Sequence, residues 1–269
     1  MVEIAISLAV IGFALVVIIG ILPFGMQTQK ENRQETIIVQ DNNVFMNAIR
    51  NGERGLDDLT NYVEAITNYQ TKYLGSPYSG ATFDATQDLG YTPTYPPEFP
   101  LTNGFRIVGL LSTPKYTPVA KGGFYSNYVV AFVRSLSGPA FEKVPQTNQD
   151  VRNFAFSYRM ISEVAPYAYY HTNWVNYLDP AIAGNTNEIT RRSNYWWVAK
   201  NLQTNLYDVR LIFRWPLLAN RTSGTGRQVF RTMASGRIWS TNELYPAAPD
   251  SYPQYNLYWF DPRNYVKAQ

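Results

Sequence analysis

Glu3 is an acidic residue in an apolar part of the sequence, where its carboxylate needs a positively charged partner. It precedes residues 4–26, a run in which Ser7 is the only side chain that is not apolar. A carboxylate among packed aliphatic helices costs on the order of a few kcal/mol until a cation reaches it. No lysine or arginine precedes Lys30. The carboxylate therefore needs a cation from outside this run.

Other candidate catalytic residues are few. His171 is the only histidine, and no Gly-x-Ser-x-Gly motif accompanies it, which argues against a hydrolase triad and a multi-histidine metal site. Asp57 and Asp58 are adjacent, so on a helix they do not converge on one point. Residues 224–226, Gly-Thr-Gly, lack the lysine of a phosphate loop and are typical of a turn. We expect no enzyme and no cofactor.

A metal site is not predicted either. Asp84, Asp88 and Glu98 lie in a segment rich in proline and glycine and could bind calcium, but their spacing fits no EF-hand, which favours a solvated loop. The net charge is +3, and no run of basic residues exceeds Arg191-Arg192, so no nucleic-acid partner is expected. The chain has no cysteine and therefore no disulfide.

The apolar run is long enough to cross a membrane as a helix, because a rise of about 1.5 Å per residue carries it through a hydrocarbon core of about 30 Å. A secretory signal peptide would begin with basic residues, which are missing here. Gly20, Pro23 and Gly25 predict a kink or local unwinding near its end.

Residues 2–12, Val-Glu-Ile-Ala-Ile-Ser-Leu-Ala-Val-Ile-Gly, resemble the mature N-terminus of type IV pilins and of the pseudopilins of type II secretion. The shared features are one glutamate before an apolar helix and a glycine, Gly12, nine positions after it. The glutamate is third here and normally fifth in that family, and Pro23 lies a few residues later than the common proline. The resemblance implies cleavage by a prepilin peptidase, N-methylation of the new amine, and pairing of that amine with the glutamate of a neighbouring subunit.

The resemblance also implies an α+β, pilin-like fold. Residues 1–52 would form a long kinked helix, of which 1–26 cross the bacterial inner membrane before assembly and form the filament core afterwards. Residues 53–269 would form a head with an antiparallel sheet. The implied assembly residues are Met1, Glu3, Gly12, Gly20, Pro23 and Gly25. The implied partners are further copies of the chain, the assembly machinery and the prepilin peptidase.

Periodicity extends this interpretation into the head. An apolar stripe predicts that the helix lies across one face of the sheet; it comprises Ile37, Ile38, Val44, Phe45, Ala48 and Ile49. We predict a second helix at about 56–73 and a loop over 75–100. Strands are expected at 105–111, 128–133 and 154–161, and a hairpin joins 207–215 to 227–236.

Two aromatic segments remain, residues 165–194 and the tail after Trp239. We expect them to contact neighbouring subunits or a ligand, with packing on their own domain as the alternative. The residues singled out are Tyr169, Tyr170, Trp174, Tyr177, Tyr255 and Trp259.

The predicted function is that of a structural subunit of an extracellular type IV pilus-like filament, with adhesion among the roles such a filament could serve. The alternatives are a minor pseudopilin, located in a periplasmic pseudopilus, and a membrane-anchored protein that binds carbohydrate or another surface ligand.

Overall fold

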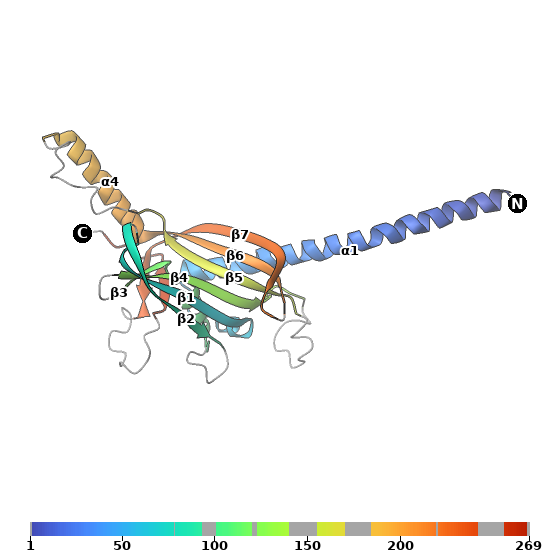
Figure 1. The fold of residues 1–269 in the computed structure, drawn as a ribbon, viewed down its shortest axis with the longest axis horizontal. Coiled ribbons are helices and arrows are strands. Elements are labelled where there is room, and N and C mark those ends of the chain that lie inside the picture. The colour runs from blue at the N-terminus through green and yellow to red at the C-terminus, as the bar shows by residue number, and fades with distance from the viewer. Residues whose placement is uncertain are drawn as a thin grey trace.

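A single long helix, α1 (Val2–Asn51), dominates the molecule: its second half packs on the head and its first half projects away from it (Figure 1). The computed structural model describes residues 2–77, 79–92, 101–119, 123–139, 155–169, 184–218, 220–241 and 256–267. The other helical elements are η1 (Asp57–Asn61), α2 (Gly104–Leu111) and α4 (Thr186–Asn205). A long apolar helix on an antiparallel sheet is the α+β architecture predicted from the sequence.

The head is built on a seven-stranded antiparallel sheet in the order β2-β1-β4-β5-β6-β7, with β3 paired to β4 outside this path. Two further strands, β8 and β9, form a small sheet of their own. The strands are β1 (Val63–Ser76), β2 (Ser79–Tyr91), β3 (Tyr116–Val119), β4 (Gly123–Arg134), β5 (Ser157–Pro166), β6 (Leu206–Leu217), β7 (Ser223–Ser235), β8 (Arg237–Ser240) and β9 (Tyr258–Asp261).

The hairpin predicted near the C-terminal end of the sheet is confirmed as β6 and β7. Its alternation places Val209, Leu211 and Phe213 on the buried face, each completely inaccessible to solvent. Antiparallel pairing runs the length of both strands, with Leu211 opposite Phe230. The residues of β6 that alternate with these therefore lie on the opposite face of the sheet.

The second half of α1 lies on the buried face of the sheet, as its apolar stripe predicts. Ile38, Phe45 and Ile49 are fully buried in the core, which they share with β6. Val44 was predicted to belong to this stripe, but it is 38% exposed. The stripe is therefore narrower than the sequence indicates.

Asp41 fastens α1 to the head through hydrogen bonds that cross the core. Its carboxylate accepts from the backbone N–H groups of Leu136 and Ser137, each at 2.9 Å, and from the Tyr158 hydroxyl at 2.9 Å. Burial raises the pKa of Asp41, while these hydrogen bonds act in the opposite direction. The three donors leave the buried carboxylate well satisfied, so α1 has one register on the sheet.

The helix predicted at about 56–73 is wrong. The chain forms the single turn η1 and then enters β1. A register shift between Val63 and Ala65 adds one residue to the strand, so Val63 and Ile66, three positions apart, pair with Val133 and Ala131 and are both buried. This bulge breaks the alternation that identifies a strand and leaves a spacing that imitates a helix.

The strand predicted at 105–111 is also wrong, because these residues form α2. Asn103 caps the helix by accepting from the Arg106 N–H at 3.0 Å, and this cap was the signal that the apolar run concealed. Gly109 allows α2 to approach β9, since a Cβ there would lie 2.7 Å from the Trp259 ring.

Two segments predicted as loops contain regular structure. Residues 79–91 form β2, an edge strand whose described side chains are mostly exposed, which explains its weak apolar pattern. Residues 186–205 form α4, a helix with no buried residue. Asn185 caps α4 by accepting from the Glu188 N–H at 3.1 Å. Strand β5 also begins at Ser157 rather than at 154.

We expect Asp41→Ala to lower the free energy of unfolding of the head by about 3 kcal/mol, because it leaves one buried and two partly buried donors without an acceptor. Tyr158→Phe removes one donor and should cost about 1 kcal/mol. Denaturant unfolding of both variants and of the double variant checks this. If the two single costs simply add, the hydroxyl and the carboxylate are not coupled and this description of the contact is wrong.

Candidate assembly surface

The first half of α1 is an apolar surface that nothing in the described head covers. Residues 2–36 include no buried side chain, and Phe13 and Phe24 are 73% and 76% exposed. The most apolar 18-residue window of the helix has a mean hydropathy of 3.0. By length and composition this segment can cross a membrane. Water-exposed apolar surface of this extent marks an interaction site.

Glu3 lies in the first turn of α1, at the tip of this surface. The backbone carbonyl of Glu3 accepts a hydrogen bond from the Ser7 hydroxyl at 2.9 Å. Its carboxylate forms no ion pair with any residue that the structure describes. Met1, the predicted partner residue, lies outside the described residues.

The other predicted assembly residues are distributed along the same exposed surface. A Cβ added at Gly12, Gly20 or Gly25 would have no described atom within 4 Å, so the isolated chain makes no use of their small size. In packed apolar helices such positions allow close approach of a neighbour. Pro23 lies inside α1, which continues through it (Figure 1), so the local unwinding predicted there is not found.

The predicted aromatic contacts divide into three groups. Trp259 is fully buried in its own head, stacked on Phe105 at 3.9 Å, with its indole N–H donating to the Phe105 carbonyl. Trp259 has no surface to offer a neighbour, and the alternative, packing on its own domain, holds for it. Tyr169 is 45% exposed. Tyr170, Trp174, Tyr177 and Tyr255 lie outside the described residues.

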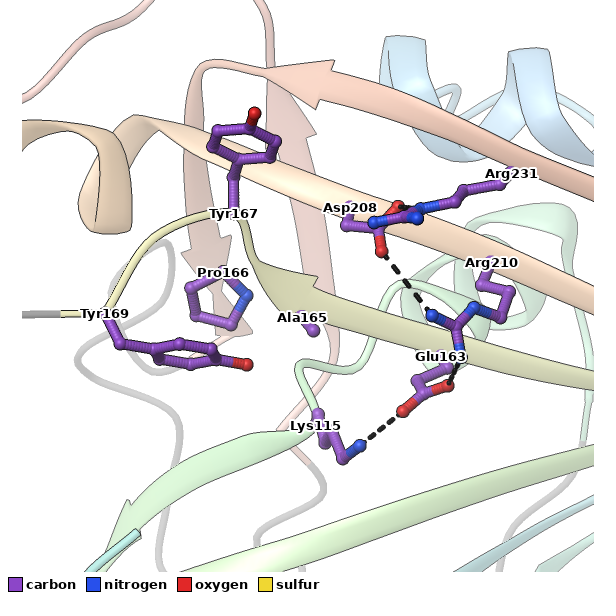
Figure 2. Close-up of a pocket in the computed structure, with 9 residues that line it drawn as sticks. All are labelled: Lys115, Glu163, Ala165, Pro166, Tyr167, Tyr169, Asp208, Arg210 and Arg231. Carbon is purple, nitrogen blue, oxygen red and sulfur yellow. Dashed lines mark hydrogen bonds and ion pairs between the residues drawn. The ribbon is translucent and has the colours of Figure 1, made fainter. Parts of the chain in front are cut away.

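A polar cavity of about 230 Å³ opens beside Tyr169 on the sheet face that points away from α1 (Figure 2). A chain of ion pairs lines one side of it. Glu163 pairs with Lys115 and, at 3.2 Å, with Arg210, and Asp208 pairs with Arg210 at 3.8 Å and with Arg231 at 2.6 Å. Tyr167 and Tyr169 stand on the other side.

Each carboxylate of this cavity is paired with two cations, and the wall carries one more positive than negative charge. The hydrogen bond with Glu163 raises the pKa of Lys115, so this amine stays protonated and is a poor base. Burial raises the pKa of the Tyr169 hydroxyl, which therefore stays neutral. The cavity thus offers hydrogen-bond donors, acceptors and two rings, an arrangement suited to holding a polar ligand.

Sequence reasoning did not identify this cavity. The sequence does contain one signal for it. Glu163 in β5 and Asp208 and Arg210 in β6 alternate with core residues, so they belong to the face of the sheet opposite the core. Lys115 gives no such signal, since only the fold brings the segment after α2 to the edge of β5.

The described residues contain no group of three or more histidine, aspartate or glutamate side chains that could hold a metal ion. Asp84, considered above as a calcium ligand, instead pairs with Lys72 at 2.5 Å. Glu98 lies outside the described residues.

Comparison of the chain with family models, curated proteins and solved structures finds no match. The resemblance to pilins therefore stands on architecture and on the N-terminal residues. The architecture is pilin-like: a helix of 50 residues is apolar and exposed at its start and packs on an antiparallel sheet at its end.

We expect removal of residues 1–26 to leave a soluble, folded monomer, because the core begins at Ile37 and no described residue before it is buried. The thermal midpoint of the truncated chain should match that of the full chain in detergent within about 2 °C, less than a loss of 1 kcal/mol would shift it. Circular dichroism and size-exclusion chromatography check this. Aggregation or loss of the transition would show that the first half of α1 supports the head.

Proposed function

We propose that the protein is a structural subunit of a type IV pilus-like filament that assembles through the first half of α1. The observation that carries this proposal is the contrast within one helix. The apolar side chains of residues 37–49 pack in the core of the head. Residues 2–26, in contrast, form a continuous apolar surface without a partner in the described part of the same chain. A bundle of these helices from many subunits supplies the missing partner.

Removing this surface from water is strongly favourable. Each large aliphatic side chain that becomes fully buried contributes about 1.5–3 kcal/mol, and the apolar run contains more than ten such side chains. In a membrane the same side chains are already removed from water. Extraction from the membrane into a filament therefore needs assembly machinery. The helix bundle must then be favoured over the bilayer by helix packing, polar pairing and exclusion of lipid.

Glu3 supplies the polar pairing. In an apolar bundle its carboxylate needs a cation, and the amine of Met1 in a neighbouring subunit meets that need without introducing a lysine or arginine. Such a pair would fix the axial register of adjacent subunits. Cleavage by a prepilin peptidase would generate the amine, and N-methylation would retain its charge.

In this proposal the precursor lies in the bacterial inner membrane and the assembled subunit in an extracellular filament. A minor pseudopilin with the same helix and a periplasmic location is the nearest alternative. The two differ in copy number and in polymerisation, because a minor component should not form filaments by itself.

A second candidate function is favoured by the polar cavity beside Tyr167 and Tyr169. A sugar ring could stack on a tyrosine there and exchange hydrogen bonds with the charged groups of the opposite wall. The protein would then be a membrane-anchored carbohydrate-binding protein, with α1 as its anchor only.

We expect Glu3→Ala to abolish or strongly reduce filament formation without changing the fold of the head. Glu35→Ala is the matched control, since Glu35 is an exposed carboxylate on the same helix outside the apolar run. Electron microscopy of sheared or reconstituted material, together with N-terminal mass analysis, checks the result. Equal filament yield from both variants would contradict the role given to Glu3.

The carbohydrate-binding candidate makes a separate prediction. Tyr169→Ala should then reduce retention of the head on immobilised glycans at least tenfold, by loss of ring stacking. Tyr195→Ala is the control, because Tyr195 is exposed on α4 and is no part of the cavity wall. If the parent head is not retained on any glycan, this second candidate is eliminated.

A further inference from the structure

The sheet face that points away from α1 carries a row of arginines in register. Arg159 in β5 lies opposite Arg214 in β6, which lies opposite Arg227 in β7. The sequence neighbours of Arg159 and Arg214 are buried in the core, and Arg227 occupies an exposed position opposite Arg214, so all three side chains belong to the other face. Adjacent strands are about 4.8 Å apart, and the row therefore places three positive charges within about 10 Å.

This row has no counter-charge among the residues that the structure describes. Like charges directly opposite each other destabilise a sheet, yet no described carboxylate pairs with Arg159, Arg214 or Arg227. The Nε atom of Arg159 is also buried without a hydrogen-bond partner. The lack of an ion pair distinguishes these arginines from Arg210 and Arg231 on the same face, which are paired with acids.

A fourth arginine adjoins the row. Arg221, in the turn between β6 and β7, has its guanidinium 5.3 Å from the centre of the Phe132 ring. Phe132 lies opposite Arg159 and therefore extends the row into β4. Guanidinium groups bind oxyanions in bidentate fashion and shed water more readily than an ammonium group, which suits them to phosphate.

The row lies at the end of the head from which the apolar half of α1 departs. Figure 1 shows the turn between β6 and β7 on that side, and Arg214 and Arg227 pair close to this turn. The segment that follows β4, close to the position of Phe132, contacts Asp41 of α1 through Leu136. The arginines are thus at the membrane-proximal end of the head when residues 2–26 span a bilayer.

The distance to the lipid is short. From Met26, the last residue of the apolar run, to Ile37, the first buried residue, the helix rises about 16 Å at 1.5 Å per residue. A headgroup layer about 5–7 Å thick covers part of this distance. The remaining gap of about 10 Å equals one Debye length at 0.1 M salt. An ordinary helix tilt of about 20° brings one side of the head closer still.

We propose that the Arg159, Arg214 and Arg227 row docks the head onto anionic phospholipid headgroups while α1 spans the membrane, before assembly. This inference rests on the membrane-inserted stage of the proposed function. Tethering by α1 keeps the row at high effective concentration near the lipid, so a modest attraction is sufficient. Docking would hold the subunit in one orientation at the membrane surface until it is extracted.

The surroundings of the row favour lipid over nucleic acid. The next row on this face is aliphatic; it consists of Val130, Ile161, Ile212 and Val229 in register. A single-stranded nucleic acid would require several aromatic side chains on which successive bases could stack, whereas this row contains one, Phe132, and the Arg221 guanidinium lies over its ring. A headgroup phosphate requires only the cations.

The test uses the full chain inserted into vesicles. Because the chain has no cysteine, Thr225→Cys gives a unique site for a fluorescent label on the exposed face of β7, next to the row. Vesicles of phosphatidylcholine alone, or of phosphatidylcholine and phosphatidylglycerol in equal parts, carry a headgroup quencher. Quenching should be strong only with phosphatidylglycerol and should disappear at about 1 M salt, where the Debye length is about 3 Å.

Arg214→Gln with Arg227→Gln should weaken docking about thirtyfold, since each arginine near an anionic surface contributes about fivefold. Both side chains are exposed, so the fold should tolerate the change. The matched control is Arg263→Gln with Lys267→Gln, which removes the same charge from exposed positions near the C-terminus, on the opposite side of the head from the projecting helix (Figure 1).

Two results would overturn the docking proposal alone: equal quenching in neutral and anionic vesicles, or equal weakening by the two pairs of substitutions. A different failure concerns the proposed function. If the parent chain does not float with neutral vesicles, α1 does not insert, and both the membrane stage and the docking are wrong.

Discussion

The structure depends on one constraint. A single continuous helix, α1, must pack on the head along its second half and present an exposed apolar surface along its first half. From Ile37 onward its apolar side chains pack on the sheet, and Asp41 holds it there with three hydrogen bonds. Before that point its side chains pack on nothing in the described chain. Water cannot stably surround such a surface. The exposed half of the helix therefore calls for an apolar environment outside the described chain, and the proposed function supplies it with lipid before assembly and with other copies of the chain afterwards.

The head is built so that its own stability does not require that partner. The core joins α1, α2, the large sheet and β9, where Trp259 fills the space left by Gly109. We therefore expect the head to fold without the first half of α1, whose proposed role is association. On the opposite face of the sheet, β5, β6 and β7 carry a cluster of ion pairs at one position and an arginine row without a described counter-charge at another. The two ends of this face therefore differ in charge, and only the end with the arginine row is proposed to bind an anionic surface.

Sequence patterns predicted the parts in which one signal dominates. The uninterrupted apolar run, the stripe around Phe45 and the alternation of β6 each follow from a single period, and the pilin-like fold class follows from their combination. The pattern failed where a second feature intervened: a bulge made β1 imitate a helix, and burial of most of its residues made α2 imitate a strand. The cavity at Glu163 could not be predicted, because it depends on which strands become neighbours. The arginine row was equally hidden, since register is a property of pairing.

The central claim is that residues 2–26 find their partner in other copies of the same chain. Electron cryo-microscopy of assembled material from the native cell surface tests it most directly. The account predicts a helical filament whose axis is a bundle of α1 segments, with Glu3 of one subunit beside the N-terminal amine of another and the heads outside. A monodisperse monomer whose apolar segment stays in detergent or lipid, with no ordered filament, would contradict it.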